Sequence, residues 1–325
     1  MKAPFVWFGG KRRVAPEVWG ALGDVDNYVE PFAGSLAVLL ERPHEGQRTM
    51  TVNDADGFVA NFWRALHADP EQVARYADWP VNEVDLFARH MWLMEHKADV
   101  LDSMHADPEF FDAKIAGWWV WGVCSWIGGG WCAGNGPWRV VDGQPVKVQP
   151  GQGVKRQRPH LGAGQGVNRQ LPHGLIGYFE DLAAALRDVR VCCGDWSRVV
   201  TNGALAHWAT VGVFLDPPYL GEIRDPGLYA VDDHTIAHDV RDWCLANGDN
   251  PRYRIVLAGY SPEHDHLIPD AWRRIRWSAS GSYSTAAAAL RQDGNHENRH
   301  LETLWCSPHC LDPANAAPTL FEDAS

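Results

Sequence analysis

The chain has no hydrophobic run long enough to cross a bilayer, and its first residues show no signal-peptide pattern. We therefore expect a cytoplasmic protein. Its 7 cysteines include no Cys-x-x-Cys pair, which predicts reduced core thiols. Metal-ligand spacing is missing as well: Cys306, His309 and Cys310 make at most half a zinc site, and His234 and His238 lack a third ligand. We expect no bound metal.

Positive charge is scarce. The 29 Lys and Arg residues face 41 Asp and Glu, which gives a formal charge of −12 over 325 residues. This balance is unusual for a nucleic-acid-binding protein, because affinity for phosphates normally rests on Lys and Arg. Apolar residues make up 46% of the chain and include 17 Trp, which is enough for a packed core. The length fits one α/β core with a sizeable insertion.

The few bases are concentrated in one segment. Between Ala113 and Phe179 the only acid is Asp142. The segment is rich in Gly, Pro, Gln and Trp, and a basic loop of this kind can follow a phosphate backbone and reach base edges. A disordered linker is the alternative, but the segment interrupts a domain instead of joining two. Its candidate DNA-binding residues are Arg139, Lys147, Lys155, Arg156, Arg158 and Arg169.

One stretch has the features of an active-site loop. The apolar run from Val213 to Leu215 ends in Asp216-Pro217-Pro218-Tyr219. Because proline cannot donate to a sheet ladder, this pattern predicts a buried strand that stops at a short rigid loop. In an open α/β sheet, a loop at the carboxyl end of a strand lies in the crevice where ligands bind. A turn that only ends the strand is the alternative.

The loop suits methyl transfer to the exocyclic amine of a base. This amine is a poor nucleophile until hydrogen-bond acceptors localise its lone pair. The Asp216 carboxylate and the Pro217 carbonyl can each accept one amine hydrogen, since proline fixes the backbone there. Tyr219 can stack on a base rotated out of the duplex. These residues are therefore the candidate catalytic group, together with Pro218.

A second set of residues predicts a cofactor site. The stretch Glu30-Pro31-Phe32-Ala33-Gly34 indicates a strand followed by a glycine turn, with a helix expected after it, so that backbone amides face a cofactor. The turn is not G-x-G-x-x-G, which argues against NAD. Asp54 ends the next strand about 20 residues later, a spacing at which an acid can hold ribose hydroxyls. Capping the helix that follows is the alternative role for Asp54.

Further strands and turns complete the predicted sheet. A strand from Val189 to Cys193 precedes Gly194-Asp195-Trp196, where the acid and the ring can hold a cofactor adenine. Strands are also expected at 254–260 and 301–305, and helices between apolar strands give a mostly parallel sheet. Near the N-terminus, Gly9-Gly10-Lys11 allows close approach of the backbone, and Lys11 can meet a carboxylate or a phosphate. A solvated surface turn is the alternative there.

Seven short motifs occur in an order that resembles the Dam-type adenine-N6 DNA methyltransferases of the alpha group. They span most of the chain, and as an ordered set they are highly specific. The motifs are Trp7-Phe8-Gly9-Gly10-Lys11, Glu30-Pro31-Phe32-Ala33-Gly34-Ser35, Asn53-Asp54, Gly194-Asp195-Trp196, Asp216-Pro217-Pro218-Tyr219, Leu257-Ala258-Gly259-Tyr260 and Glu302-Thr303-Leu304-Trp305.

The resemblance implies a Rossmann-like class I methyltransferase with a mostly parallel sheet, helices on both faces and an inserted target-recognition region. It implies a catalytic domain from residues 1–67 and 176–325, with the insertion at 68–175. S-adenosylmethionine is the implied methyl donor and double-stranded DNA the substrate, and we expect a monomer. Leu36 stands where many members have a second glycine. The implied cofactor-binding residues are Trp7, Lys11, Glu30, Phe32, Ala33, Gly34, Asp54, Asp195 and Trp196.

Two other functions stay open on the residues alone. The catalytic loop recognises only an amino group, so cytosine N4 or an adenine in RNA would also fit. A nucleic-acid-binding module without catalysis is the third reading, although Asp216, Asp54 and Gly34 argue against it.

Overall fold

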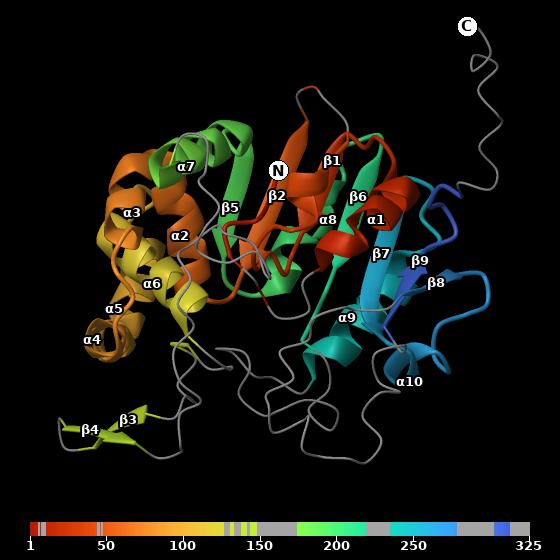
Figure 1. Ribbon diagram of the computed structural model, residues 1–325. Helices are drawn as coiled ribbons and strands as arrows, with labels where there is room; N and C mark the ends of the chain where they lie inside the picture. Colours follow the sequence, from red (N-terminus) through yellow and green to blue (C-terminus); the bar gives the residue numbers. More distant parts are fainter. Residues whose placement is uncertain are drawn as a thin grey trace, which may run out of the picture.

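A computed structural model describes residues 1–5, 7, 11–43, 46, 48–126, 131–132, 138–141, 144–147, 174–218, 235–277 and 302–312. At its centre is a seven-stranded sheet in the order β5-β2-β1-β6-β7-β9-β8 (Figure 1). Neighbouring strands are parallel except for β9, which is antiparallel to β7 and β8. The predicted α/β class with a mostly parallel sheet is confirmed. The strands are β1 (Asn27–Glu30), β2 (Thr49–Asp54), β5 (Val189–Cys193), β6 (Val211–Leu215), β7 (Tyr253–Tyr260), β8 (Arg273–Trp277) and β9 (Glu302–Cys306).

Helices cover both faces of the sheet. The central strands β6 and β9 are buried at every residue, as expected for strands enclosed on both sides. Alternate side chains enter two separate cores: Phe214 and Val256 pack on the side of α1 and α2, whereas Val213 and Ile255 pack on the side of α9. These helices are α1 (Ala15–Leu22), α2 (Gly57–Ala68) and α9 (Ile236–Asn247).

A group of helices packs beside the β5 edge of the sheet (Figure 1). Helix α6 is buried on most of its surface, including Trp119 and Trp121, and it contacts α2, α3 and α4. The group comprises α3 (Pro70–Ala77), α4 (Glu83–Glu95), α5 (Lys97–Ala106), α6 (Ala113–Ser125) and α7 (Gly174–Ala185). Two further strands, β3 (Trp138–Val141) and β4 (Gln144–Lys147), pair antiparallel with each other.

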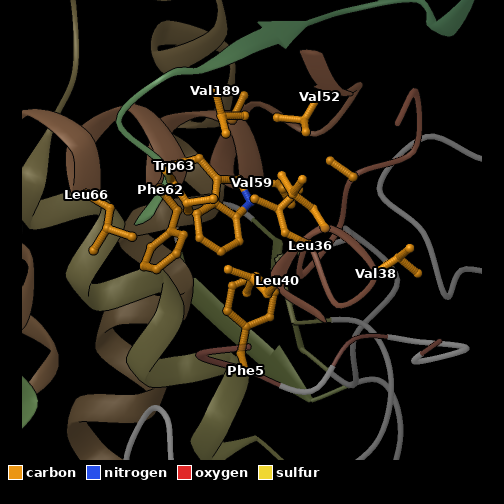
Figure 2. Packing of buried hydrophobic residues seen from close by; sticks show 14 of the residues in the cluster. Phe5, Leu36, Val38, Leu40, Val52, Val59, Phe62, Trp63, Leu66 and Val189 are labelled. Carbon is orange, nitrogen blue, oxygen red and sulfur yellow. The ribbon is translucent and has the colours of Figure 1, made fainter. Parts of the chain in front are cut away.

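Aromatic side chains join the N-terminus to this helical group. The ring of Phe5 meets Phe62 edge-on at 5.5 Å between centroids and Trp119 at 5.1 Å. Figure 2 shows Phe5, Phe62 and Trp63 in one cluster with Leu36 and Val52. The helices and the sheet therefore share a continuous core.

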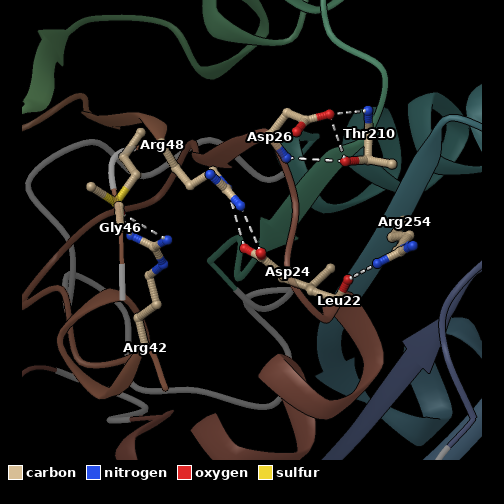
Figure 3. Close-up of polar contacts among 9 residues, drawn as sticks. Leu22, Asp24, Asp26, Arg42, Gly46, Arg48, Thr210 and Arg254 are labelled. Carbon is tan, nitrogen blue, oxygen red and sulfur yellow. Dashed lines mark hydrogen bonds and ion pairs between the residues drawn. The ribbon is translucent and has the colours of Figure 1, made fainter. Parts of the chain in front are cut away.

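Polar contacts hold together the end of the sheet at which the parallel strands β1, β6 and β7 begin (Figure 3). The Asp26 carboxylate accepts hydrogen bonds from the backbone and the hydroxyl of Thr210, both at 2.9 Å. These bonds set the register of β1 against β6. Arg254 donates to the carbonyl of Leu22 at 2.5 Å and ties β7 to the end of α1.

One sequence-based expectation and one alternative role are wrong in detail. The helix predicted after the glycine turn is only a 3-10 turn, η2 (Leu39–Glu41). Leu36 lies in the left-handed region with φ 55°, and Pro43 disfavours a helical conformation at Arg42, so there is no room for a longer helix. Asp54 does not cap α2, because Asp56 accepts the hydrogen bond from the Phe58 amide.

Within the part of the chain that the structure describes, no helix combines the length and the apolar character that crossing a membrane requires.

Candidate active site

Four carboxylates lie at one edge of the sheet. Glu30 ends β1, Asp54 ends β2 and Asp216 follows β6 directly. Because β9 is antiparallel, its first residue, Glu302, pairs with Tyr260 at the end of β7 and belongs to the same edge. The strand order reverses between β1 and β6, which is the switch point where ligands bind in open α/β sheets. The topology thus brings the predicted acids together.

The glycine turn is tied to the end of β2. Gly34 lies at φ 45° and its amide donates to Oδ2 of Asp54 at 2.9 Å. The other oxygen of Asp54 accepts the amide of Asp56 at 2.9 Å, and the Ala33 amide donates to the Asn53 carbonyl at 2.9 Å. The turn and the strand end form one rigid unit.

Trp7 packs directly on this turn. A Cβ atom added to Gly34 would lie 2.3 Å from Cδ1 of Trp7, a separation that atoms cannot adopt. Trp63 donates its indole N–H to the Gly34 carbonyl at 3.0 Å. Only glycine fits here, on both steric and conformational grounds.

Asn53 joins three strand ends and was not assigned a role from the sequence. Its buried Nδ2 donates to the carbonyls of Pro31 at 3.1 Å and Gly194 at 2.9 Å. These two bonds link β2 to the residues after β1 and β5. The signal in the sequence was an amide directly before the acid that ends a strand.

Asp195 and Trp196 differ in their surroundings. Asp195 is exposed and caps η3 (Trp196–Val199) by accepting the Ser197 amide at 2.9 Å. Trp196 is buried, and its ring stacks on Phe32 with centroids 6.1 Å apart and 27° between planes. Phe32 and Trp196 therefore form one aromatic surface after β1 and β5.

An ion-pair cluster surrounds Asp216. Nζ of Lys11 lies 3.0 Å from Oδ1 of Asp216 and 3.6 Å from Oε2 of Glu302, and it lies 5.7 Å from the centre of the Trp277 ring. Lys11 begins η1 (Lys11–Arg13) and is almost fully buried. The lysine predicted to lie beside the cofactor thus contacts the predicted catalytic acid. Sequence reasoning gave no role to Glu302, whose signal was a single charge opening an apolar strand.

Burial shifts the protonation of these acids. It raises the pKa of Asp216 to about 6, against the effect of the Lys11 ammonium. The pKa of Asp54 rises to about 7 and that of Glu30 to about 8, again mainly through burial. Burial opposes the charge of Lys11, but Asp216 and Glu302 together raise its pKa. Burial therefore favours the protonated form of all three acids more than in water.

Pro217 and Pro218 are buried behind Asp216. Several other predicted residues cannot be placed in the site. Tyr219, Lys155, Arg156, Arg158 and Arg169 lie outside the described residues, and Arg139 and Lys147 are placed only through the backbone of β3 and β4.

Comparison with known proteins identifies the N-terminal part of the chain. Residues 7–90 match the family model of the D12 class N6 adenine-specific DNA methyltransferases. The matched segment contains Trp7, Lys11, the glycine turn and Asp54. Among curated proteins, no sequence matches the chain.

Proposed function

The chain is an adenine-N6 DNA methyltransferase, matched to the D12 class over residues 7–90, and from that premise we propose how its site works. S-adenosylmethionine is the proposed methyl donor, bound at the glycine turn. Asp216 is the proposed acceptor for the hydrogens of the target amine. The observation that carries this proposal is the 3.0 Å ion pair between Lys11 and Asp216 at the end of β6, beside the acids of β1 and β2.

The donor end of the site fits a nucleoside cofactor. Each oxygen of Asp54 accepts one backbone amide and keeps a lone pair for a ribose hydroxyl. Because Gly34 has no side chain, Trp7 packs directly against the backbone of the turn. Trp7 and Glu30 flank the same unit, and Phe32 with Trp196 offers an aromatic surface for the adenine, where Asp195 would accept its amine. When bound, the donor supplies an electrophilic methyl group.

The acceptor end of the site prepares the amine. A carboxylate within reach of an amine N–H localises the nitrogen lone pair, and a carbonyl at Pro217 would accept the second hydrogen. Lys11 favours the ionised form of Asp216, which is the form that accepts hydrogen bonds. Tyr219 is proposed to stack on the extruded adenine.

We also propose the division of the chain and its contact with DNA. Residues 1–67 and 176–325 would form the catalytic domain, and 68–175 the recognition region. A monomer in the cytoplasm is sufficient, because methylating one strand at a time needs no symmetry. The proposed phosphate contacts are Arg139, Lys147, Lys155, Arg156, Arg158 and Arg169.

The test uses unmethylated DNA and labelled S-adenosylmethionine, with the product digested to nucleosides. Label in N6-methyladenine is the expected result; label in N4-methylcytosine, or only with RNA, would overturn the assignment.

The Asp216→Asn variant keeps the size of the side chain but loses the charge, and we expect its turnover to fall at least 100-fold, in the range of about 10²–10⁴ for a proton acceptor. Calorimetry should show donor binding within about twofold of wild type.

A further inference from the structure

Among the residues that the structure describes, Lys11 is shared by two carboxylates at the carboxyl edge of the sheet. Lys11 lies 3.0 Å from Asp216 and 3.6 Å from Glu302. The side chains of Lys11 and Glu302 are only 3% and 6% exposed, so water screens their interaction weakly. The Trp277 ring, 5.7 Å from Nζ, shields the ammonium further.

The topology explains why these groups meet. Asp216 follows β6 and Glu302 opens β9, and β7 lies between the two strands. With strands about 4.8 Å apart, the two backbones are separated by roughly 10 Å. Neither carboxylate would contact the other directly at that spacing, whereas Lys11 reaches both, at 3.0 and 3.6 Å.

Among Lys11, Asp216 and Glu302, the three described side chains, the charges do not cancel. Lys11 and Asp216 alone would form a neutral pair, in which the ammonium competes with a substrate amine for the carboxylate. Glu302 adds a second negative charge, and the ammonium of Lys11 interacts with both carboxylates. Buried charges interact strongly because the local dielectric constant is low, so this sharing alters the basicity of Asp216.

We propose that Glu302 is a positioning residue for methyl transfer: it draws Lys11 partly away from Asp216, which therefore stays a basic acceptor for the target amine. The inference rests on the proposed role of Asp216. The inference gives β9 a role in the reaction. Glu302 lies outside both the family match at residues 7–90 and the loop after β6.

The charge balance of the reaction requires such an acceptor. The nitrogen lone pair forms the new N–C bond, and the S–C electron pair remains on the donor sulfur. One N–H proton then passes to the Asp216 carboxylate, and its bonding pair returns to nitrogen. Because Lys11, Asp216 and Glu302 together hold two carboxylates and one ammonium, Asp216 can take up this proton while Lys11 stays charged.

The first experiment compares the pH dependence of kcat/KM for wild type and Glu302→Gln. Glu302 raises the pKa of Asp216, so its neutralisation should move the acidic limb to lower pH. Because Asp216 would be less basic, the plateau value of kcat/KM should also fall about tenfold. This loss is smaller than the loss expected when a proton acceptor is removed completely. Other titratable groups that face the cluster are Glu30 on β1 and Tyr260 on β7, and both are unchanged in the variant. An unshifted limb would overturn the proposal.

A double-mutant cycle separates positioning from simple structural support. Lys11→Met leaves two carboxylates without their shared cation, and adding Glu302→Gln removes their repulsion. We expect the double variant to be several-fold more active than Lys11→Met. A further loss of activity in the double variant would contradict the role acting through Lys11.

Two controls keep the result interpretable. Arg12 follows Lys11 in the sequence, is exposed, and pairs with Glu41 at 2.8 Å. The Arg12→Gln variant should leave the pH profile unchanged. Denaturant unfolding of each variant reports folding. Failure of wild type to form N6-methyladenine would overturn the proposed function; a normal wild type with an unshifted Glu302→Gln profile would overturn only this inference.

Discussion

At the residue scale, Gly34 is the position where sterics and conformation act together. Its φ of 45° and the 2.3 Å approach of an added Cβ to Trp7 both oppose a side chain. We predict that Gly34→Ala displaces Trp7 and weakens donor binding at least tenfold, with a stability loss of about 1–3 kcal/mol. Donor calorimetry and denaturant unfolding measure the two effects.

Gly174→Ala is the matched control for this prediction. Gly174 also has a positive φ, 70°, but an added Cβ meets nothing within 4 Å. The Gly174→Ala variant should lose only the stability that a positive φ costs an alanine, and it should bind the donor as wild type does. Equal donor affinity in the two variants would show that the Trp7 contact plays no part in the cofactor site.

At the element scale, the ends of β1, β2 and β5 act as one unit because Asn53 connects them. Asn53→Ala would leave the carbonyls of Pro31 and Gly194 without their donor. Each lost buried bond costs about 1–3 kcal/mol, so for the two bonds we predict a destabilisation of roughly 2–6 kcal/mol, together with weaker donor binding through a loosened glycine turn.

Asn61→Ala provides the comparison. Asn61 is also buried and exchanges two hydrogen bonds with the backbone of Asp112, at 3.0 and 2.9 Å, but these bonds join α2 to the residue that caps α6. We expect a similar shift of the unfolding midpoint without a change in donor affinity. If both variants lost donor affinity equally, general destabilisation would be the cause.

Local patterns were sufficient to predict six of the seven strands of the sheet and the loops at their ends, but they did not predict β8. Apolar runs ending in Asp54 and Asp216 each correspond to a strand with an acid at its carboxyl end. The missing helix after the glycine turn reflects the conformation of Leu36 and the following proline, which the strand-turn-helix pattern does not encode. The pairing of Lys11 with Glu302 depends on β9 lying antiparallel beside β7, and no local pattern contains that contact.

At the scale of the whole molecule, charge is divided between parts of the chain. The helical stretch 68–126 holds 11 acids and 4 bases, so it would repel DNA phosphates. The bases at 139–169 are the remaining candidates within the proposed recognition region. Acids also gather inside the fold, at the carboxyl edge of the sheet, where their burial affects the stability of the entire domain.

Stability should therefore fall as the pH rises through the range in which the buried acids ionise. The pKa of Glu30 is about 8 in the folded protein, against 4.5 as its ordinary value. Between these values the folded state holds a proton that the unfolded state has released, so the free energy of unfolding decreases with increasing pH. The stabilising effect of that proton is complete below pH 4.5 and is lost as the pH passes 8.

Glu30→Gln tests this link, because the amide resembles the protonated acid in shape and never ionises. In the absence of donor, we predict that the variant matches wild type near pH 5 and is more stable near pH 9, by an amount on the order of a few kcal/mol. Urea unfolding at a series of pH values measures the difference. The exposed Glu17→Gln control should follow the wild-type curve throughout. A constant difference between Glu30→Gln and wild type at every pH would mean that the pKa of Glu30 is the same in the folded and the unfolded protein, and would contradict the prediction.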